Sequence, residues 1–332
     1  MGFLQKTVLG GMIMNGTEIK ELNKERLFLA IYNHKWLTAR QLGEVGWPNQ
    51  SEDSKRVSAS RFIKQNIEDG YLLERSIKEV GGTIATLSRK GEKWMNDLGF
   101  SVMGGYKWGK LSEDGIWKPP SNYWHDFMAN EFLTVELSRR MLEINQEKMD
   151  SHSYFVNLYE NLVDYQHCNE REFRKTSEKT QTPDGVFWDQ GQYDNYGDGC
   201  LPAYFIEVES YRKSGKKMNR MLYGCLTRTK EYETSIKVWR HPIEKANEHK
   251  SELMRFGEAT TIFVYDINEK DERGYQLNHR QRIISGFQSK FEKFGWGAIL
   301  DNKSYFSIVF APFDSKTGRF LVWENYEFKI AS

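Results

Sequence analysis

The chain has 332 residues and a formal net charge of +1, which is enough sequence for two domains with separate hydrophobic cores. Hydrophobic residues make up 39% and aromatic residues 14%, which excludes a disordered chain. The charge is uneven, because residues 1–110 hold 17 Lys and Arg against 12 Asp and Glu, whereas residues 111–332 hold 30 against 34. This asymmetry is typical of a DNA-binding module joined to a metal-binding one, although unequal solvated surfaces would produce the same pattern.

The cysteines and the first residues bear on the cellular compartment. Cys168, Cys200 and Cys225 form no CxxC pair and are odd in number, which argues against a disulfide framework and a structural zinc site. The first 14 residues are too short to span a membrane, and no cleavage site follows them. We therefore expect a soluble, cytoplasmic protein with no membrane partner.

The first hundred residues are expected to form short helices and one hairpin. Thr38 and Ser88 are candidate N-caps, and Gly81-Gly82 is typical of a hairpin turn. Apolar spacing and turn residues predict helices at 18–33, 39–44, 53 to about 70 and 90–98, with strands at 71–75 and 83–87. This order resembles a winged helix-turn-helix, so we expect residues 1–104 to form such a domain.

The third of these helices is expected to read double-stranded DNA. It holds no acidic residue from Ser54 to Gln65, and cations beside small hydroxyl side chains suit a helix that lies in a major groove next to phosphates. A winged-helix module that binds protein is the alternative. The candidate DNA-binding residues are Lys55, Arg56, Arg61 and Lys64.

Residues 105–121 are rich in Gly, Lys, Trp and Pro, and composition predicts a linker there. The second domain is then expected to span 122–332. Its predicted helices are 125–145, 213–232 and 278–294, and its predicted strands include 153–159, 186–188, 204–209, 260–266, 305–313 and 320–324, with an irregular stretch at 164–180.

Three carboxylates are expected to converge in this second domain. Side chains alternate along a strand, so Glu207 and Glu209 share one face of the strand at 204–209. Asp184 precedes the short apolar strand at 186–188, and pairing of the two strands would bring all three acids together. Their mutual repulsion would raise their pKa values unless a cation is present, and oxygen ligands suit Mg²⁺ or Mn²⁺.

The order of elements from 121 to 267, with acids on the second and third strands, resembles the PD-(D/E)xK nuclease fold. In this resemblance Pro183-Asp184 is the "PD" and Glu207 opens the "ExK" pair. Glu209 stands where the motif has a Lys, which normally orients the attacking water. Lys216, or its neighbours Lys213 and Lys217, would then supply a displaced positive charge, or the third carboxylate would hold a second metal.

The whole chain also resembles the replication-relaxation family of plasmids and mobile elements, which includes the C-class mobilisation relaxases. The matching features are His125 with Asn130, Pro183-Asp184-Gly185, and Phe205-Ile-Glu207-Val-Glu209 followed by basic residues. The resemblance implies a winged helix joined to a nuclease-like domain, with His125 in the catalytic site beside the acids and Glu131 as a possible extra ligand.

Two functions from different classes remain open. The first is a site-recognising, Mg²⁺- or Mn²⁺-dependent DNA nickase or relaxase that acts in plasmid mobilisation or replication with other relaxosome or replication proteins. Its nucleophile would be water or a tyrosine, with Tyr211 and Tyr223 near the acids. The second is a non-catalytic regulator of replication or transcription with a degenerate nuclease fold. The absent motif Lys favours the second, the retained acids favour the first, and a homodimer is open for both.

Overall fold

The computed structural model describes residues 8–9, 12–13, 16–47, 50–100, 102–139, 167–169, 183–188, 200–210, 215–229, 232–237, 251–300 and 305–330. The chain divides into two compact units. Unit 1 is built on Met1–Tyr123, and unit 2 on Trp124–Glu136, Tyr165–Val238 and Lys250–Ser332. Both units contain helices and strands, so the protein is of the mixed α and β class. Within the described part of the chain, no helix is long and apolar enough to cross a membrane.

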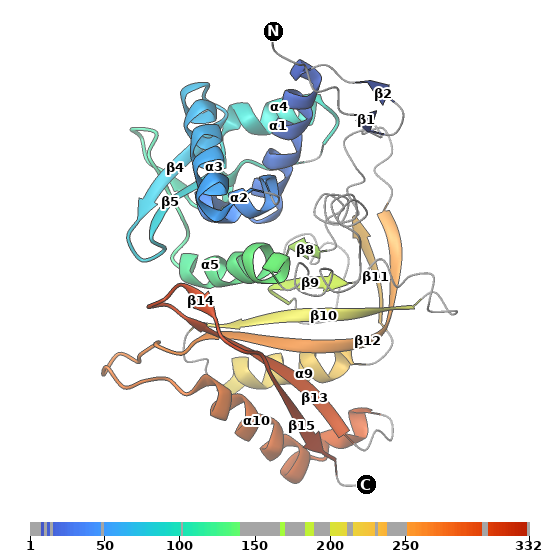
Figure 1. The fold of residues 1–332 in the computed structure, drawn as a ribbon. Helices are drawn as coiled ribbons and strands as arrows, with labels where there is room; N and C mark the ends of the chain where they lie inside the picture. The colour runs from blue at the N-terminus through green and yellow to red at the C-terminus, as the bar shows by residue number, and fades with distance from the viewer. Residues whose placement is uncertain are drawn as a thin grey trace. The chain divides into compact units, whose positions relative to one another are not determined.

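Unit 1 surrounds a small antiparallel sheet with helices (Figure 1). Its elements are β1 (Val8–Leu9), β2 (Met12–Ile13), α1 (Gly16–Asn33), β3 (Leu37–Thr38), α2 (Ala39–Gly46), α3 (Glu52–Glu68), β4 (Leu72–Ile77), β5 (Gly82–Leu87) and α4 (Arg89–Asp97). The sheet order is β3-β5-β4, and β1 pairs with β2 separately. From α1 onward the elements occur in the order expected from the sequence. The turn between β4 and β5 needs Gly81, whose φ is +72°.

Local capping and aromatic packing explain these boundaries. The Thr38 hydroxyl accepts a hydrogen bond from the Gln41 backbone N–H, and the Gln41 side chain accepts one from the Thr38 N–H, so α2 begins with a capping box. The Ser88 hydroxyl caps α4 by accepting a hydrogen bond from the Gly91 N–H, and both predicted caps are confirmed. At the centre of the unit, the fully buried Phe28 lies against three aromatic rings at centroid distances of 5.4–6.0 Å.

The segment 105–121 is folded onto unit 1 and is not an extended linker. It forms a 3-10 turn, η1 (Gly105–Trp108), and an antiparallel pair, β6 (Lys110–Leu111) with β7 (Trp117–Lys118). Trp108 is buried and stacks on Tyr32 with centroids 5.9 Å apart, and Trp117 is 1% exposed. The linker expectation therefore fails because two tryptophans bury large apolar surfaces here and outweigh the Gly- and Pro-rich composition.

Unit 2 is organised by an eight-stranded sheet of mixed direction. Its strands are β8 (His167–Asn169), β9 (Gly185–Trp188), β10 (Cys200–Glu209), β11 (Tyr232–Lys237), β12 (Ser251–Asp266), β13 (Tyr305–Asp314), β14 (Arg319–Phe320) and β15 (Glu324–Lys329). The main order is β14-β13-β12-β10-β9-β8, while β11 pairs with β12 and β15 with β13. β8, β9 and β10 form an antiparallel meander, and β12 lies parallel to both β10 and β13.

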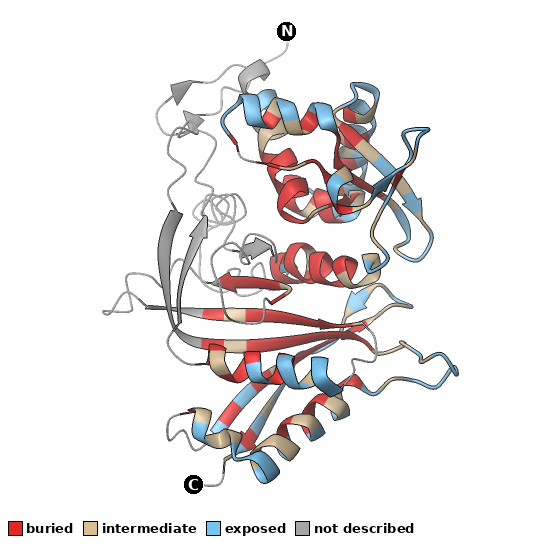
Figure 2. Cartoon of the chain, turned by 180° about the vertical axis from the view of Figure 1, so that it is seen from behind, coloured by how far each residue is buried: buried red, intermediate tan, exposed pale blue. Residues whose placement is uncertain are grey.

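Helices cover both faces of this sheet (Figure 1). They are α5 (Tyr123–Glu131), which continues as the π-helical turn η2 (Phe132–Glu136), then α9 (Gly215–Arg228), α10 (His279–Phe294) and the 3-10 turn η4 (Trp296–Leu300). α9 and α10 bury their apolar sides against β12 and β13 in one cluster. α5 lies on the opposite face, and Figure 2 shows that α5 and the central strands are largely buried.

The later predicted elements agree with the structure only in part. α10 and β13 match the expected 278–294 and 305–313, β12 begins at Ser251 and not at 260, and α9 is shorter than the expected 213–232. β8 lies within the stretch 164–180 that was expected to be irregular. The expected strand at 320–324 is instead two strands, β14 and β15, separated where Trp323 stacks on Phe132 with centroids 5.1 Å apart. The first helix of unit 2 is described only to residue 139, and the predicted strand at 153–159 lies outside the described residues.

A glycine substitution tests whether 105–121 is part of unit 1. A Cβ at Gly105 would overlap the Thr86 side chain, so Gly105→Ala should lower the free energy of unfolding by about 1–3 kcal/mol. Gly82→Ala is the matched control, because a Cβ there meets nothing within 4 Å. Chemical denaturation monitored by tryptophan fluorescence measures both. Equal stability of the two variants would mean that 105–121 does not pack on β5.

Candidate functional site

The α3 helix has one face that packs against unit 1. Its buried residues recur at helical spacing and are Lys55, Ala59, Ile63 and Asn66. Lys55 is thus part of the packed face, and its ammonium group lies 2.7 Å from Glu44 of α2. The prediction that Lys55 contacts DNA does not agree with this placement, because its side chain is only 9% exposed and already paired. Lys55 therefore lies on the buried face of α3, whereas the other three candidate cations are exposed.

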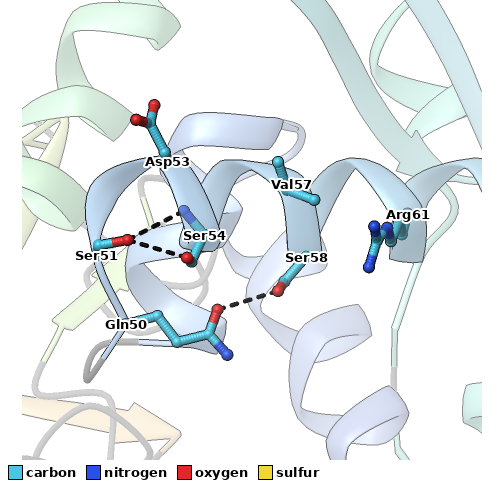
Figure 3. A pocket seen from close by; sticks show the side chains of 7 residues that line it. All are labelled: Gln50, Ser51, Asp53, Ser54, Val57, Ser58 and Arg61. Carbon is cyan, nitrogen blue, oxygen red and sulfur yellow. Dashed lines mark hydrogen bonds between the residues drawn. The ribbon is translucent and has the colours of Figure 1, made fainter.

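The opposite face of α3 is exposed and cationic. Arg56, Arg61 and Lys64 are all exposed there, and the nearest acid, Asp53, lies 3.8 Å from Arg56 at the start of the helix. This face borders a shallow pocket of about 470 Å³, in which the Ser58 hydroxyl donates to Gln50 and Ser51 caps the helix (Figure 3). The pocket is lined by Gln50, Ser51, Asp53, Ser54, Val57, Ser58 and Arg61.

The three acids of unit 2 belong to β10 and to the residue just before β9. β9 ends its pairing with β10 at Gly185, opposite Ile206. Asp184 extends this pairing, because its N–H donates to the Ile206 carbonyl at 2.9 Å and its carboxylate accepts the Val208 N–H at 2.7 Å. Gly185 has a packing role, since a Cβ there would lie 3.0 Å from Leu133 of η2. Asp184 therefore lies beside Ile206 and Val208 near the C-terminal end of β10.

His125 of α5 meets one of these three acids, Asp184. Its Nε2 lies 3.2 Å from the Asp184 carboxylate, and its Nδ1 lies 3.9 Å from Asp126. Burial alone would lower the pKa of His125, but the charges of Asp184 and Asp126 outweigh burial and raise the pKa to about 10. His125 is therefore a cation at neutral pH and balances the charge of Asp184. The structure brings these two predicted residues together.

Glu207 is paired with a cation that the sequence reasoning missed. Arg228, at the end of α9, donates to the Glu207 carboxylate at 2.5 Å, and the two side chains are 0% and 2% exposed. Burial alone would lower the pKa of Arg228, but the charge of Glu207 outweighs it and raises the pKa. The guanidinium also lies 5.1 Å from the centre of the Phe205 ring. Glu207 and Arg228 thus form a buried ion pair.

Glu209 is buried on the same face as Glu207, as strand alternation predicted. Glu207 and Glu209 lie opposite Phe263 and Tyr265 of β12, which face α9 and α10. The candidate cation Lys216 is exposed in the first turn of α9. Twelve residues, or about 18 Å of helix, separate it from the residue that pairs with Glu207. The displaced positive charge expected from Lys216 is therefore supplied by another residue of α9.

The amphipathic pattern of α9 contains a signal for this missed residue. Arg228 follows Met221 and Cys225 at helical spacing, so it falls on the buried stripe of the helix. A buried arginine requires an anionic partner, and the neighbouring strand offers Glu207. The position of Arg228 on the buried side of α9 therefore identifies it as the partner of Glu207, whereas closeness in sequence to Glu207 does not.

Two of the three carboxylates expected to hold a metal ion have cationic partners in the protein. Among the residues that the structure describes, no three His, Cys, Asp or Glu side chains come together as a metal-binding group. Asp184 interacts with His125 and the Val208 N–H, and Glu207 interacts with Arg228, so two of the three proposed ligands already meet positive partners. Tyr223 is half exposed on α9, and Tyr211 lies outside the described residues.

Comparison of the chain with protein-family models, with curated proteins and with solved structures gives no match. The resemblance to the replication-relaxation family therefore remains a prediction from the motifs.

The buried ion pair leads to a stability prediction. Arg228→Met removes the cation and leaves Glu207 buried without it, which should lower the free energy of unfolding by about 3–5 kcal/mol. The double variant Glu207→Gln/Arg228→Met should regain much of this loss, because no uncompensated charge remains. Urea denaturation of the single and double variants gives the coupling energy. Additive losses in the double variant would contradict the pairing.

The His125–Asp184 pair leads to a pH prediction. Its folded-state pKa of about 10 lies above the ordinary 6.5, so protonation of His125 stabilises the folded state. That stabilisation is complete below pH 6.5 and is lost as the pH rises through about 10. The wild-type protein should therefore exceed His125→Gln in stability most near pH 6, where Asp184 is ionised and His125 protonated, with a difference that shrinks toward pH 10. Urea titrations at each pH measure this, and a constant difference would exclude the raised pKa.

Proposed function

We propose that the protein binds double-stranded DNA at a preferred sequence through unit 1. The observation that carries this proposal is the exposed face of α3, which presents Arg56, Arg61 and Lys64 along a stretch, Ser54 to Gln65, that contains no acidic residue. The element order and the β3-β5-β4 sheet support a winged helix-turn-helix, in which the third helix enters the major groove. In this role Lys55 holds α3 on α2, and the other three cations contact the DNA.

Unit 2 adds a nuclease-like but charge-balanced domain to this DNA-binding unit. A helix, an antiparallel meander, a second helix and a parallel strand follow one another, which supports the PD-(D/E)xK resemblance. However, Asp184 and Glu207 are balanced by His125 and Arg228. We therefore favour a non-catalytic regulator of plasmid replication or transcription, in which unit 2 keeps the nuclease shape without its metal chemistry.

A metal-dependent nickase or relaxase is the second candidate. The observation that favours it is the meeting of His125 with Asp184, since the family resemblance assigns both to the site. Glu209 is buried on the same strand face as Glu207 and provides a further carboxylate. If Mg²⁺ or Mn²⁺ bound there, Asp184, Glu207 and Glu209 would hold it, and the ion would supply charge stabilisation at the scissile phosphate.

The DNA-binding proposal leads to a salt-dependence prediction. Each of Arg61→Ala and Lys64→Ala should weaken binding and reduce the slope of log affinity against log salt by about one unit, because each removes one phosphate contact. Fluorescence anisotropy with a selected duplex at several salt concentrations measures this. Lys270→Ala, an exposed lysine of unit 2, is the matched control and should leave the slope unchanged. An unchanged slope in both α3 variants would remove α3 from the interface.

A plasmid assay separates the two candidates. We expect supercoiled plasmid that carries the selected site to stay supercoiled with the wild-type protein and Mg²⁺ or Mn²⁺, because the acids are already balanced. Conversion to open circles that disappears in Asp184→Asn and in Glu209→Gln, with DNA affinity retained, would establish the nickase. Gel electrophoresis after protease treatment gives the readout and also detects a protein–DNA link.

A further inference from the structure

One side chain on the DNA-facing side of α3 has no explanation in the packing of the protein. Val57 is 44% exposed, and along α3, all of which the structure describes, it is the only exposed large apolar residue. The apolar residues that hold the helix to unit 1, Ala59 and Ile63, lie on the opposite face. A β-branched residue also has a lower helix propensity than Ala, so Val57 does not serve the helix itself.

The surroundings of Val57 favour a nucleic-acid partner over an apolar one. Ser54 and Arg61 lie one turn to either side of it, Ser58 follows it directly, and all three border the same shallow pocket (Figure 3). The hydroxyls donate and accept hydrogen bonds, and the guanidinium of Arg61 attracts an anion. The exposed carboxylate of Asp53, one turn before Val57, also borders the pocket and can accept a hydrogen bond from a base amino group. A single apolar group inside a polar, charged surface matches the major-groove edge of a base pair, where thymine presents one methyl group among hydrogen-bonding atoms.

We infer that Val57 is a specificity-determining residue that packs against the C5-methyl group of a thymine in the major groove. The inference rests on the proposed DNA binding by α3 and adds which base the helix distinguishes. Val57 lies between Ser54 and Arg61 on the exposed side, so the middle of the helix face meets the base edges while the cations meet phosphates. Cytosine and deoxyuridine lack this methyl group and leave the isopropyl group without its contact.

The test uses the full chain and a duplex selected from a random pool. Each thymine of the selected duplex is replaced in turn by deoxyuridine, which removes only the methyl group, and affinity is measured by anisotropy at fixed salt. We expect one position at which the wild-type protein loses about three- to fivefold in affinity, the effect of burying one methyl group. Val57→Ala should bind the thymine duplex with the same loss and be insensitive to deoxyuridine there.

Two controls keep the result specific to this contact. Val57→Thr retains a methyl group and should keep most of the thymine preference. Ile116→Ala removes an apolar side chain of similar exposure, 48%, elsewhere in unit 1 and should leave the deoxyuridine effect unchanged.

The outcomes distinguish a failure of the Val57 inference from a failure of the proposed DNA binding. Wild-type protein that binds every deoxyuridine duplex as tightly as the thymine duplex would overturn the role of Val57 while DNA binding stands. Val57→Ala that keeps the full deoxyuridine loss would also overturn it. Failure to enrich any duplex from the pool would instead reject DNA binding itself.

Discussion

The buried ion pair between Glu207 and Arg228 is the constraint on which the interpretation of unit 2 depends. Removing a carboxylate from water costs several kcal/mol unless a partner compensates it, and Glu207 is buried near the C-terminal end of β10. Arg228 satisfies this need from α9, and His125 does the same for Asp184 from α5. Helices on the two sides of the sheet therefore each deliver one cation, Arg228 to Glu207 and His125 to Asp184.

In unit 1, burial decides which cations of α3 are available to bind DNA. Lys55 and Arg56 are adjacent in sequence, but a helix turns about 100° per residue, so one pairs with Glu44 and the other faces solvent. The helix is thereby anchored by a buried pair and presents Arg61 and Lys64 outward. Val57 shares this outer face, which makes α3 both a structural element and the proposed reading surface.

Periodicity and caps predicted much of the fold, because they depend on residues close in sequence. Thr38 and Ser88 cap the helices expected to follow them, and the shared face of Glu207 and Glu209 follows from strand geometry alone. The failures involve partners distant in sequence. The Gly- and Pro-rich composition of 105–121 predicted a linker, although Trp108 is buried there. Closeness in sequence to Glu207 pointed to Lys216, although the cation that pairs with Glu207 is Arg228. Buried pairs depend on tertiary packing, which local patterns do not contain.

Calorimetric titration of the purified protein with Mn²⁺ tests the central claim, that Glu207 and Asp184 are balanced by Arg228 and His125, most directly. The account predicts no stoichiometric binding that depends on Glu207, so the wild-type protein and Glu207→Gln should give the same weak heats. Binding of one ion per chain to the wild-type protein, lost in both Glu207→Gln and Asp184→Asn while their folding is intact, would contradict it. That result would show that the metal displaces the internal cations and would restore the nuclease interpretation.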